Sequence, residues 1–144
     1  MRLLVQRAAQ ASVRVAGNII GEIGQGQMVL VGIEKNDTEG DVKRLAEKLL
    51  NYRMFSDADD KMNLNVKQIA GGVLLVSQFT LAADTKKGLR PGFSTAAEPN
   101  KAKMLFDLFV QLVKDKHDQV ATGEFGADMQ VSLINDGPVT FLLE

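Results

Sequence analysis

Hydrophobic and polar residues alternate, or hydrophobic residues run without a break, over several short stretches of the chain, and both patterns are typical of β-strands. Strands are predicted on this basis at residues 3–7, 12–15, 19–23, 27–33, 53–55, 73–79, 129–134 and 139–143. The continuous runs 27–33 and 73–79 predict strands that are buried on both faces. Turns are predicted at 16–18, which forms a hairpin, and at 135–138, after which the chain is expected to run back.

Two segments have helical spacing instead. Hydrophobic residues recur every three or four positions after Thr38, which predicts a helix over about 38–51, and Thr38 with Asp41 forms a variant capping box. A second apolar stripe begins after Pro99, a residue that suits the first turn of a helix. Many strands with two interspersed helices indicate an α+β domain with mixed or mostly antiparallel sheets.

Residues 84–97 form a loop that is rich in glycine, proline and polar residues, and it is long for a domain of this size. Lys86, Lys87 and Arg90 make a basic cluster within it. Such a cluster either keeps a surface loop soluble or binds phosphates through its positive charges. The sequence leaves both interpretations open.

The amino-acid composition limits the catalytic and metal-binding chemistry that is possible. The 144 residues include no cysteine and one histidine, His117, which excludes disulfides, thiolate nucleophiles and histidine-rich metal sites. No cofactor or metal is predicted, and His117, in a charged run at a helix end, is rejected as a base. The first residues resemble neither a signal peptide nor a membrane span, so a cytoplasmic protein without a membrane partner is expected. A net charge of −1 predicts no binding of DNA and only small, local contacts with RNA.

Two short strings carry more information. Ser77-Gln-Phe-Thr-Leu81 follows a buried strand, and Asn135-Asp-Gly-Pro-Val-Thr140 contains a Gly-Pro bond. Each has an ordinary interpretation, as a strand end and as a turn. Together they resemble the two signature motifs of the D-aminoacyl-tRNA deacylase (D-tyrosyl-tRNA deacylase) family. The stretches 55–57, 61–65 and 125–132 also resemble this family, and the resemblance covers nearly the whole chain.

The resemblance implies a single domain, residues 1–144, with a barrel-like core and two main helices, which forms a homodimer. It implies hydrolysis of the ester of D-aminoacyl-tRNA, and of mischarged glycyl-tRNA, to free amino acid and tRNA. Only about 5–6% of X-Pro bonds are cis, but the family motif implies that Gly137–Pro138 is cis. In the family, this element enters the partner's active site and occupies the space of an L side chain.

The resemblance also assigns site residues. The catalytic segment is Ser77, Gln78, Phe79 and Thr80, and substrate contacts are expected from Ala102, Phe125 and Met129. Independently of the resemblance, the charge of Lys86, Lys87 and Arg90 makes them candidates for binding the acceptor-end phosphates. For Phe125 and Met129 the alternative is a place in the core, and for Ala102 it is helix propensity.

No side chain of the first motif is a competent base at neutral pH. We therefore expect backbone N–H groups of Phe79 and Thr80 to stabilise the oxyanion, and the ribose hydroxyl next to the ester to relay the proton. Thr80 either orients the substrate or acts as a nucleophile, which requires an adjacent base. Two other functions stay open: a non-catalytic module that binds the tRNA acceptor end, and a general hydrolase of small esters.

Overall fold

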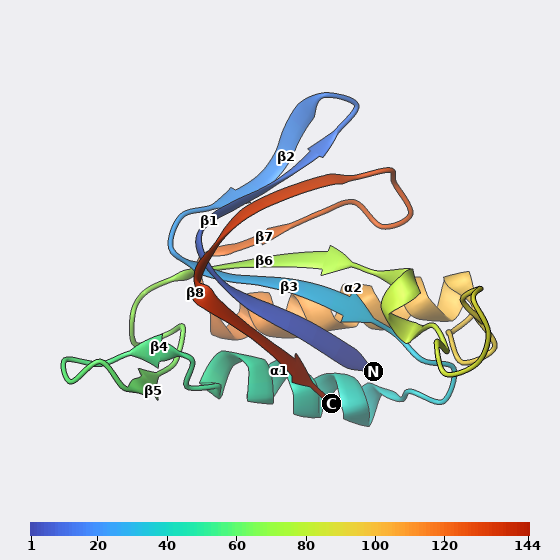
Figure 1. Ribbon diagram of the computed structural model, residues 1–144, viewed down its shortest axis with the longest axis horizontal. Coiled ribbons are helices and arrows are strands. Elements are labelled where there is room, and N and C mark those ends of the chain that lie inside the picture. Colours follow the sequence, from blue (N-terminus) through green and yellow to red (C-terminus); the bar gives the residue numbers. More distant parts are fainter.

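The computed structural model describes residues 1–144, and Figure 1 shows a large curved sheet with two long helices against it and a separate two-stranded sheet. The strands are β1 Arg2–Val15, β2 Asn18–Ile23, β3 Gly26–Gly32, β4 Phe55–Ser56, β5 Met62–Leu64, β6 Gly72–Ser77, β7 Val120–Thr122 and β8 Gln130–Leu143. The helices are α1 Glu39–Asn51, the short 3-10 helix η1 Phe79–Ala82, and α2 Pro99–Lys116. Two long helices and a mixed sheet confirm the predicted α+β class.

β1 is the central strand. The strands β2 and β3 follow one another along one of its edges, and β8 pairs with it from residue 3 to residue 14 of β1, all antiparallel. β6 then pairs with β3, and β7 with β6, in parallel. Leu3 pairs with Leu143, so the first and last strands of the chain lie side by side.

The sheet curls until its ends meet, which confirms the barrel-like core. A Cβ atom on Gly21 of β2 would lie 2.6 Å from the carbonyl oxygen of Thr122 on β7, closer than any side chain permits. Glycine is therefore required where these two strands, at opposite ends of the sheet path, pack backbone to backbone.

Both helices are amphipathic and cover the same face of the sheet (Figure 1). Val42, Leu45 and Leu49 of α1, with Leu105 and Phe109 of α2, are buried in one core with side chains of β1, β3 and β6. Each such burial stabilises the fold by about 1.5–3 kcal/mol. The predicted capping box is confirmed, since the Thr38 side chain accepts from the Asp41 N–H and Asp41 accepts from the Thr38 N–H.

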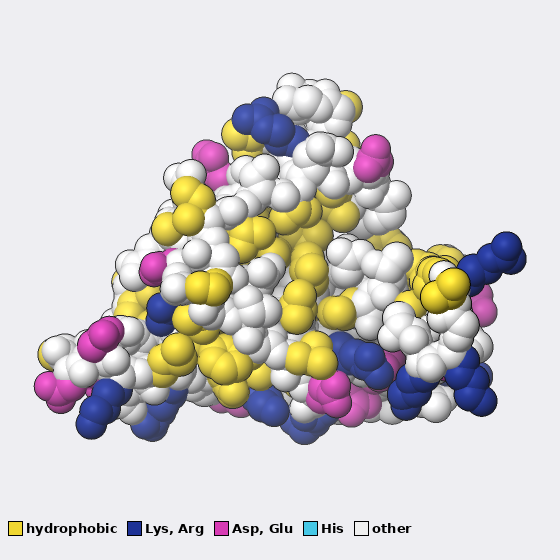
Figure 2. Space-filling model, viewed as in Figure 1, with side chains coloured by type: hydrophobic (Ala, Val, Ile, Leu, Met, Phe, Trp, Pro, Cys, Tyr) yellow, Lys and Arg dark blue, Asp and Glu magenta, His cyan; other side chains and the backbone are white.

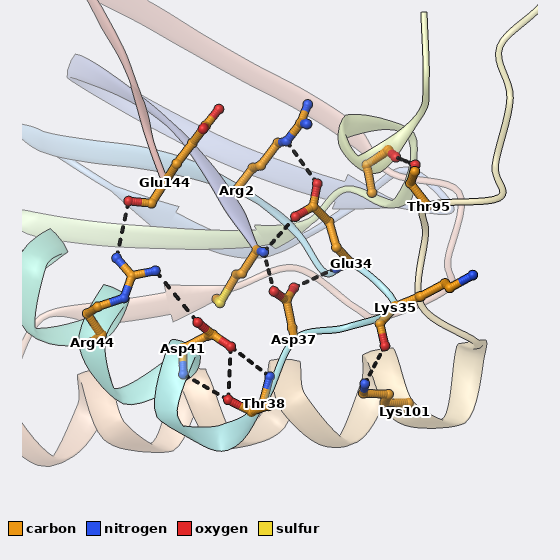
Figure 3. Close-up of polar contacts among 12 residues, drawn as sticks. Arg2, Glu34, Lys35, Asp37, Thr38, Asp41, Arg44, Thr95, Lys101 and Glu144 are labelled. Atoms are coloured by element: carbon orange, nitrogen blue, oxygen red, sulfur yellow. Dashed lines mark hydrogen bonds and ion pairs between the residues drawn. The ribbon is translucent and has the colours of Figure 1, made fainter.

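Polar contacts fix the segment between β3 and α1 (Figure 3). The ammonium group of Met1 is buried and contacts the carboxylates of Glu34 and Asp37, and Asp37 also accepts the Glu34 N–H at 2.6 Å. The Lys101 side chain of α2 donates to the Lys35 carbonyl oxygen. The start of β1, the end of β3 and the first turns of both helices are thereby tied together.

Two predictions about how strands continue were wrong, and of the predicted strand 53–55 only Phe55 lies in a strand, β4. Residues 3–7 and 12–15 belong to one strand, and no turn reverses the chain at 135–138, because β8 runs without reversal alongside β1. The register explains the difference. A step of two residues on β1, from Gln6 to Ala8, is matched by a step of five on β8, from Thr140 to Asn135. Residues 136–139 therefore bulge out of a continuing strand.

Candidate active site

The first motif forms a strand-to-helix turn. Ser77 ends β6, the Gln78 N–H donates to the Val31 carbonyl oxygen at 2.8 Å, and the chain then enters η1. The observed strand β6 therefore ends two residues before the end of the predicted strand 73–79. Because the N–H groups at the start of a helix lack partners within it, those of Phe79 and Thr80 have no partner inside η1.

A cavity of about 480 Å³ opens beside this turn. It lies beyond the carboxyl ends of β3 and β6, next to the first turn of α2 and the segment that leads into β8. It brings together six of the predicted site residues: Ser77, Gln78, Phe79, Ala102, Phe125 and Met129. The other lining residues are Val31, Ile33, Val76, Ala97, Pro99, Gly126, Ala127 and Val131. No lining residue is ionisable near neutral pH, so the cavity offers no side-chain acid or base.

Thr80 is exposed at the edge of this site and is not among the lining residues. Its hydroxyl oxygen accepts a hydrogen bond of 2.6 Å from the Gln78 side-chain amide. A carboxamide is neutral in either orientation and cannot take up the hydroxyl proton. The geometry therefore holds Thr80 in place without activating it as a nucleophile.

Phe125 and Met129 face the cavity and the core at once. The Phe125 ring lies 6.0 Å from that of Phe106 in the main core. Met129 packs against the smaller core cluster, and its sulfur occupies the space that a Cβ on Gly123 would need. Both side chains are half-buried, so they pack against the core and also line the cavity, while their contact with substrate stays a prediction.

The basic cluster lies on the surface. Lys86, Lys87 and Arg90 are exposed, form no salt bridge and do not line the cavity. Their loop is anchored at its base, where Asp84 and Gly92 exchange backbone hydrogen bonds of 2.8 and 3.0 Å.

The second motif lies away from the cavity of its own chain. Gly137–Pro138 is a cis peptide, and Gly137 has a φ of 141°. Neither residue lines the cavity. Asn135 braces the bulge by accepting the Val139 N–H at 2.7 Å. A single chain therefore does not bring its two motifs together.

Arg7 supports this bulge and was missed from the sequence. Its Nε donates to the Asp136 carbonyl oxygen at 2.8 Å, and its Nη1 donates to the Met54 carbonyl oxygen at 3.1 Å. The side chain is only 14% exposed. A signal was present, because Arg7 continues the alternation of the buried residues Leu3 and Val5. A charge at an inward position indicates a specific partner.

The three carboxyl groups whose pKa is clearly lowered all lie outside the cavity. Hydrogen bonds from Thr38 lower the pKa of Asp41, a hydrogen bond from Lys116 lowers the pKa of Glu47, and backbone N–H groups of its own turn lower the pKa of Asp57. These groups stabilise turns and helix contacts, and none belongs to the site.

Other candidate features serve the fold. His117 follows α2, and its Nε2 lies 2.7 Å from the Gly71 carbonyl oxygen, so it joins the helix end to the start of β6. The structure holds no group of three or more acidic or histidine side chains that could bind a metal ion. Neither long helix has the length and hydropathy of a membrane span.

Comparison with known proteins shows which class of protein has this fold and these motifs. A family model described as "D-Tyr-tRNA(Tyr) deacylase" matches residues 4–144. The class is that of hydrolases acting on the ester bond of aminoacyl-tRNA. The chain belongs to the D-Tyr-tRNA(Tyr) deacylase family, as the two motifs predicted.

Relatives support this membership over the full length. A D-aminoacyl-tRNA deacylase of Marinomonas sp. (strain MWYL1) is 65% identical, with 100% of each chain covered. One from Escherichia coli O81 is 57% identical and covers 100% of this chain and 99% of its own.

Two solved structures share the fold. One, called "c-Myc DNA Unwinding Element Binding Protein", has a TM-score of 0.96 and 38% identity over 100% of this chain and 98% of its own. The other, described as a probable eukaryotic D-amino acid tRNA deacylase, has a TM-score of 0.85 over 99% of this chain and 97% of its own. At 17% identity, the second likeness concerns the fold alone.

Proposed function

We propose that this protein hydrolyses the ester that joins a D-amino acid to the terminal ribose of tRNA, and that it rejects L-aminoacyl groups sterically. The observation that carries the proposal is the cavity beside η1, which is lined by Phe79 at the start of that helix and by no ionisable side chain. We infer that the N–H groups of Phe79 and Thr80, which have no partner within η1, face this cavity. Such a site can polarise an ester carbonyl but leaves the proton to the substrate.

The reaction balances without a protein base. A water oxygen bonds to the carbonyl carbon, and the N–H groups of Phe79 and Thr80 stabilise the negative oxygen that forms. The water proton passes to the free ribose hydroxyl beside the ester, which relays a proton to the leaving ribose oxygen as the C–O bond breaks. The products are the free amino acid and tRNA with both hydroxyl groups restored. Thr80 orients the substrate through its backbone and its hydroxyl.

The terminal adenosine fits the apolar part of the cavity. Phe125 and Met129 provide surfaces on which a base can stack, a common mode of recognition for unpaired RNA. Ala102 is a small residue on the first turn of α2 and leaves room there. Lys86, Lys87 and Arg90 are proposed to contact acceptor-end phosphates.

Selectivity requires a rigid wall near the substrate Cα, and we propose that Gly137 and Pro138 of a second subunit supply it. Glycine lets a backbone approach closely and proline fixes it. A wall at this position leaves a D side chain free to point outward, so many D-residues are accepted. Glycine has no side chain to be rejected, so glycyl-tRNA is cleaved as well.

A homodimer is supported by the uncovered face of the sheet. Leu4 pairs with Leu30 on β3 and with Leu142 on β8, so the three side chains form a row on the face opposite the helices. Leu142 is 49% exposed, and Figure 2 shows hydrophobic side chains gathered over the middle of this face. An apolar row beside a long strand with one free edge is typical of a protein interface.

The test combines turnover with assembly. Deacylation of D- and L-aminoacyl-tRNA bearing the same amino acid is followed by release of labelled amino acid, and mass in solution by analytical ultracentrifugation. We expect hydrolysis of the D-substrate only, by a dimer. Leu142→Glu should give an inactive monomer, whereas Ile19→Glu, at an apolar position on β2 that is 44% exposed, should stay dimeric and active. A monomer with full activity contradicts the cross-subunit wall.

Two alternatives are separated by the same assay. A non-catalytic acceptor-end binder would bind the tRNA without releasing amino acid, and a general esterase would cleave simple amino-acid esters as fast as the tRNA. One solved relative is named for DNA binding, but the net charge of −1 favours a short strand end over a duplex. We place the activity in the cytoplasm, where aminoacyl-tRNA is used.

A further inference from the structure

Two phenylalanine rings are stacked in the open at the mouth of the cavity. The ring centroids of Phe79 and Phe93 lie 4.7 Å apart at an interplanar angle of 23°. Phe79 is 51% exposed and Phe93 is 41% exposed, and they are the exposed members of seven phenylalanines. Since large aromatic side chains stabilise a fold by burial, a half-exposed pair indicates a contact with something outside the chain.

The fold fixes this pair in place. Phe79 begins η1, and Phe93 directly follows the paired residues Asp84 and Gly92. The Thr95 hydroxyl donates to the Ala82 carbonyl oxygen at 2.5 Å, which joins the far side of the loop to the end of η1. η1 and the anchored loop therefore hold the two rings in place without a ligand, as a preformed binding surface requires.

Positive charge lies next to the rings. Between Asp84 and Phe93 the chain carries Lys86, Lys87 and Arg90, and the single carboxylate of this stretch, on Asp84, already accepts the Lys86 N–H at 2.9 Å. None of the three cations has a salt-bridge partner. Figure 2 shows hydrophobic side chains bordered by Lys and Arg side chains at this loop, which Figure 1 places beside η1.

We propose that the Phe79–Phe93 pair stacks the unpaired base that precedes the terminal adenosine of the tRNA acceptor strand. Phe79 both lines the cavity and is half exposed, so a strand whose last nucleotide occupies the cavity leaves it past this ring. Aromatic side chains beside a cationic groove are the usual site for single-stranded nucleic acid. The proposal rests on the proposed function and adds a second nucleotide site to it.

The pair therefore serves affinity for the strand and leaves the ester chemistry unchanged. Recognition by stacking tolerates any base and is assisted by phosphate contacts, which weaken with salt. A substrate that ends at the adenosine has no base to place on Phe93, and its hydrolysis is independent of this ring.

The test compares two substrates, D-aminoacyl-tRNA and D-aminoacyl-adenosine, with the full-length protein. Phe93→Leu keeps an apolar side chain but removes the ring. We expect KM for the tRNA to rise about tenfold with kcat unchanged, and no change for the adenosine substrate. Phe93→Tyr should restore the wild-type KM. Leu89→Ala, at a fully exposed apolar residue of the same loop, is the matched control and should behave as wild type.

A second measurement does not depend on a folded variant. A fluorescent adenine analogue that is quenched by stacking replaces the base before the terminal adenosine, and wild-type protein should quench it. Unquenched fluorescence, an unchanged KM in Phe93→Leu, or an equal loss on both substrates would overturn the proposal. If wild-type protein cleaves neither substrate yet quenches the analogue, the proposed hydrolysis fails and the stacking site stands.

Discussion

The cavity beside η1 and the bulge at Gly137–Pro138 are built in opposite ways. The cavity is mostly apolar, lies where β6 ends, and borders the start of η1, whose first N–H groups have no partner within that helix. The bulge is exposed, lies within a continuing strand, and has its backbone tied by Arg7 and Asn135. Reaction chemistry needs unpaired donors, whereas exclusion needs a surface that does not yield.

We infer from this difference that the cavity carries out the reaction and the bulge selects the substrate. A site without an ionisable side chain depends on the substrate for its proton transfer, and so it does not distinguish D from L by chemistry. In the proposed mechanism discrimination comes from shape, and we assign it to the braced bulge. The first three predictions alter the substrate, the bulge and the cavity edge in turn, and the fourth tests whether a metal takes part.

The largest effect is expected when the substrate loses the ribose hydroxyl next to the ester. A D-aminoacyl-tRNA with a terminal deoxyadenosine, esterified on its remaining hydroxyl, should bind normally but lose about 10²–10⁴-fold in kcat. Single-turnover deacylation measures the loss, and a filter-binding assay measures the affinity. Turnover near that of the normal substrate would mean that a protein group supplies the base.

Loss of the bulge's support should change selectivity more than rate. Arg7→Ala removes charge-assisted hydrogen bonds to the Asp136 and Met54 carbonyl oxygens, each worth about 1.5–3 kcal/mol. We expect the preference for D- over L-aminoacyl-tRNA to fall about tenfold or more, while hydrolysis of glycyl-tRNA is largely retained. Arg14→Ala, which removes an exposed bond on the same strand, is the control. Unchanged selectivity in Arg7→Ala would separate the bulge from discrimination.

A smaller effect is expected at Thr80. Thr80→Ala removes a hydroxyl that Gln78 holds but does not activate, and loss of one hydrogen bond costs about 0.5–1.5 kcal/mol. The kcat should therefore fall about tenfold or less. A catalytic nucleophile behaves differently, because its loss costs about 10⁶-fold in kcat. A folded, substrate-binding but inactive Thr80→Ala protein would support the covalent mechanism.

The smallest effect is expected from metal removal. The chain has no cysteine, one histidine and no group of three potential ligands, and a catalytic zinc needs three protein ligands. Exhaustive chelation should leave kcat/KM unchanged. Activity that is lost on chelation and restored by zinc would refute this prediction.

The helices could be predicted from local information because their signals are local. The spacing of the buried α1 residues and the Thr38–Asp41 box lie within one segment. The bulge could not be predicted in this way. Asn135 to Pro138 has the composition of a turn, and only the pairing with β1, more than a hundred residues away in sequence, decides that the strand continues.

The same limit applies to the site. That Ser77, Gln78 and Phe79 line one cavity could be predicted, because the segment is contiguous and resembles a known family, whereas their catalytic role stays a prediction. Arg7 and Phe93 were missed because their roles depend on partners distant in sequence or across a loop, Asp136 for one and Phe79 for the other. The residues next to Arg7 and Phe93 in the sequence give no indication of these partners.

The pairing of β1 with β8 also sets the order of events during synthesis. β1 is the first strand made, and its partner along one whole edge comprises residues 130–143. That edge stays unpaired on the ribosome until the far end of the chain has emerged. Late closure of such long-range pairs slows folding and leaves intermediates open to aggregation. The β1 edge is therefore open to wrong pairing until residues 130–143 have been made.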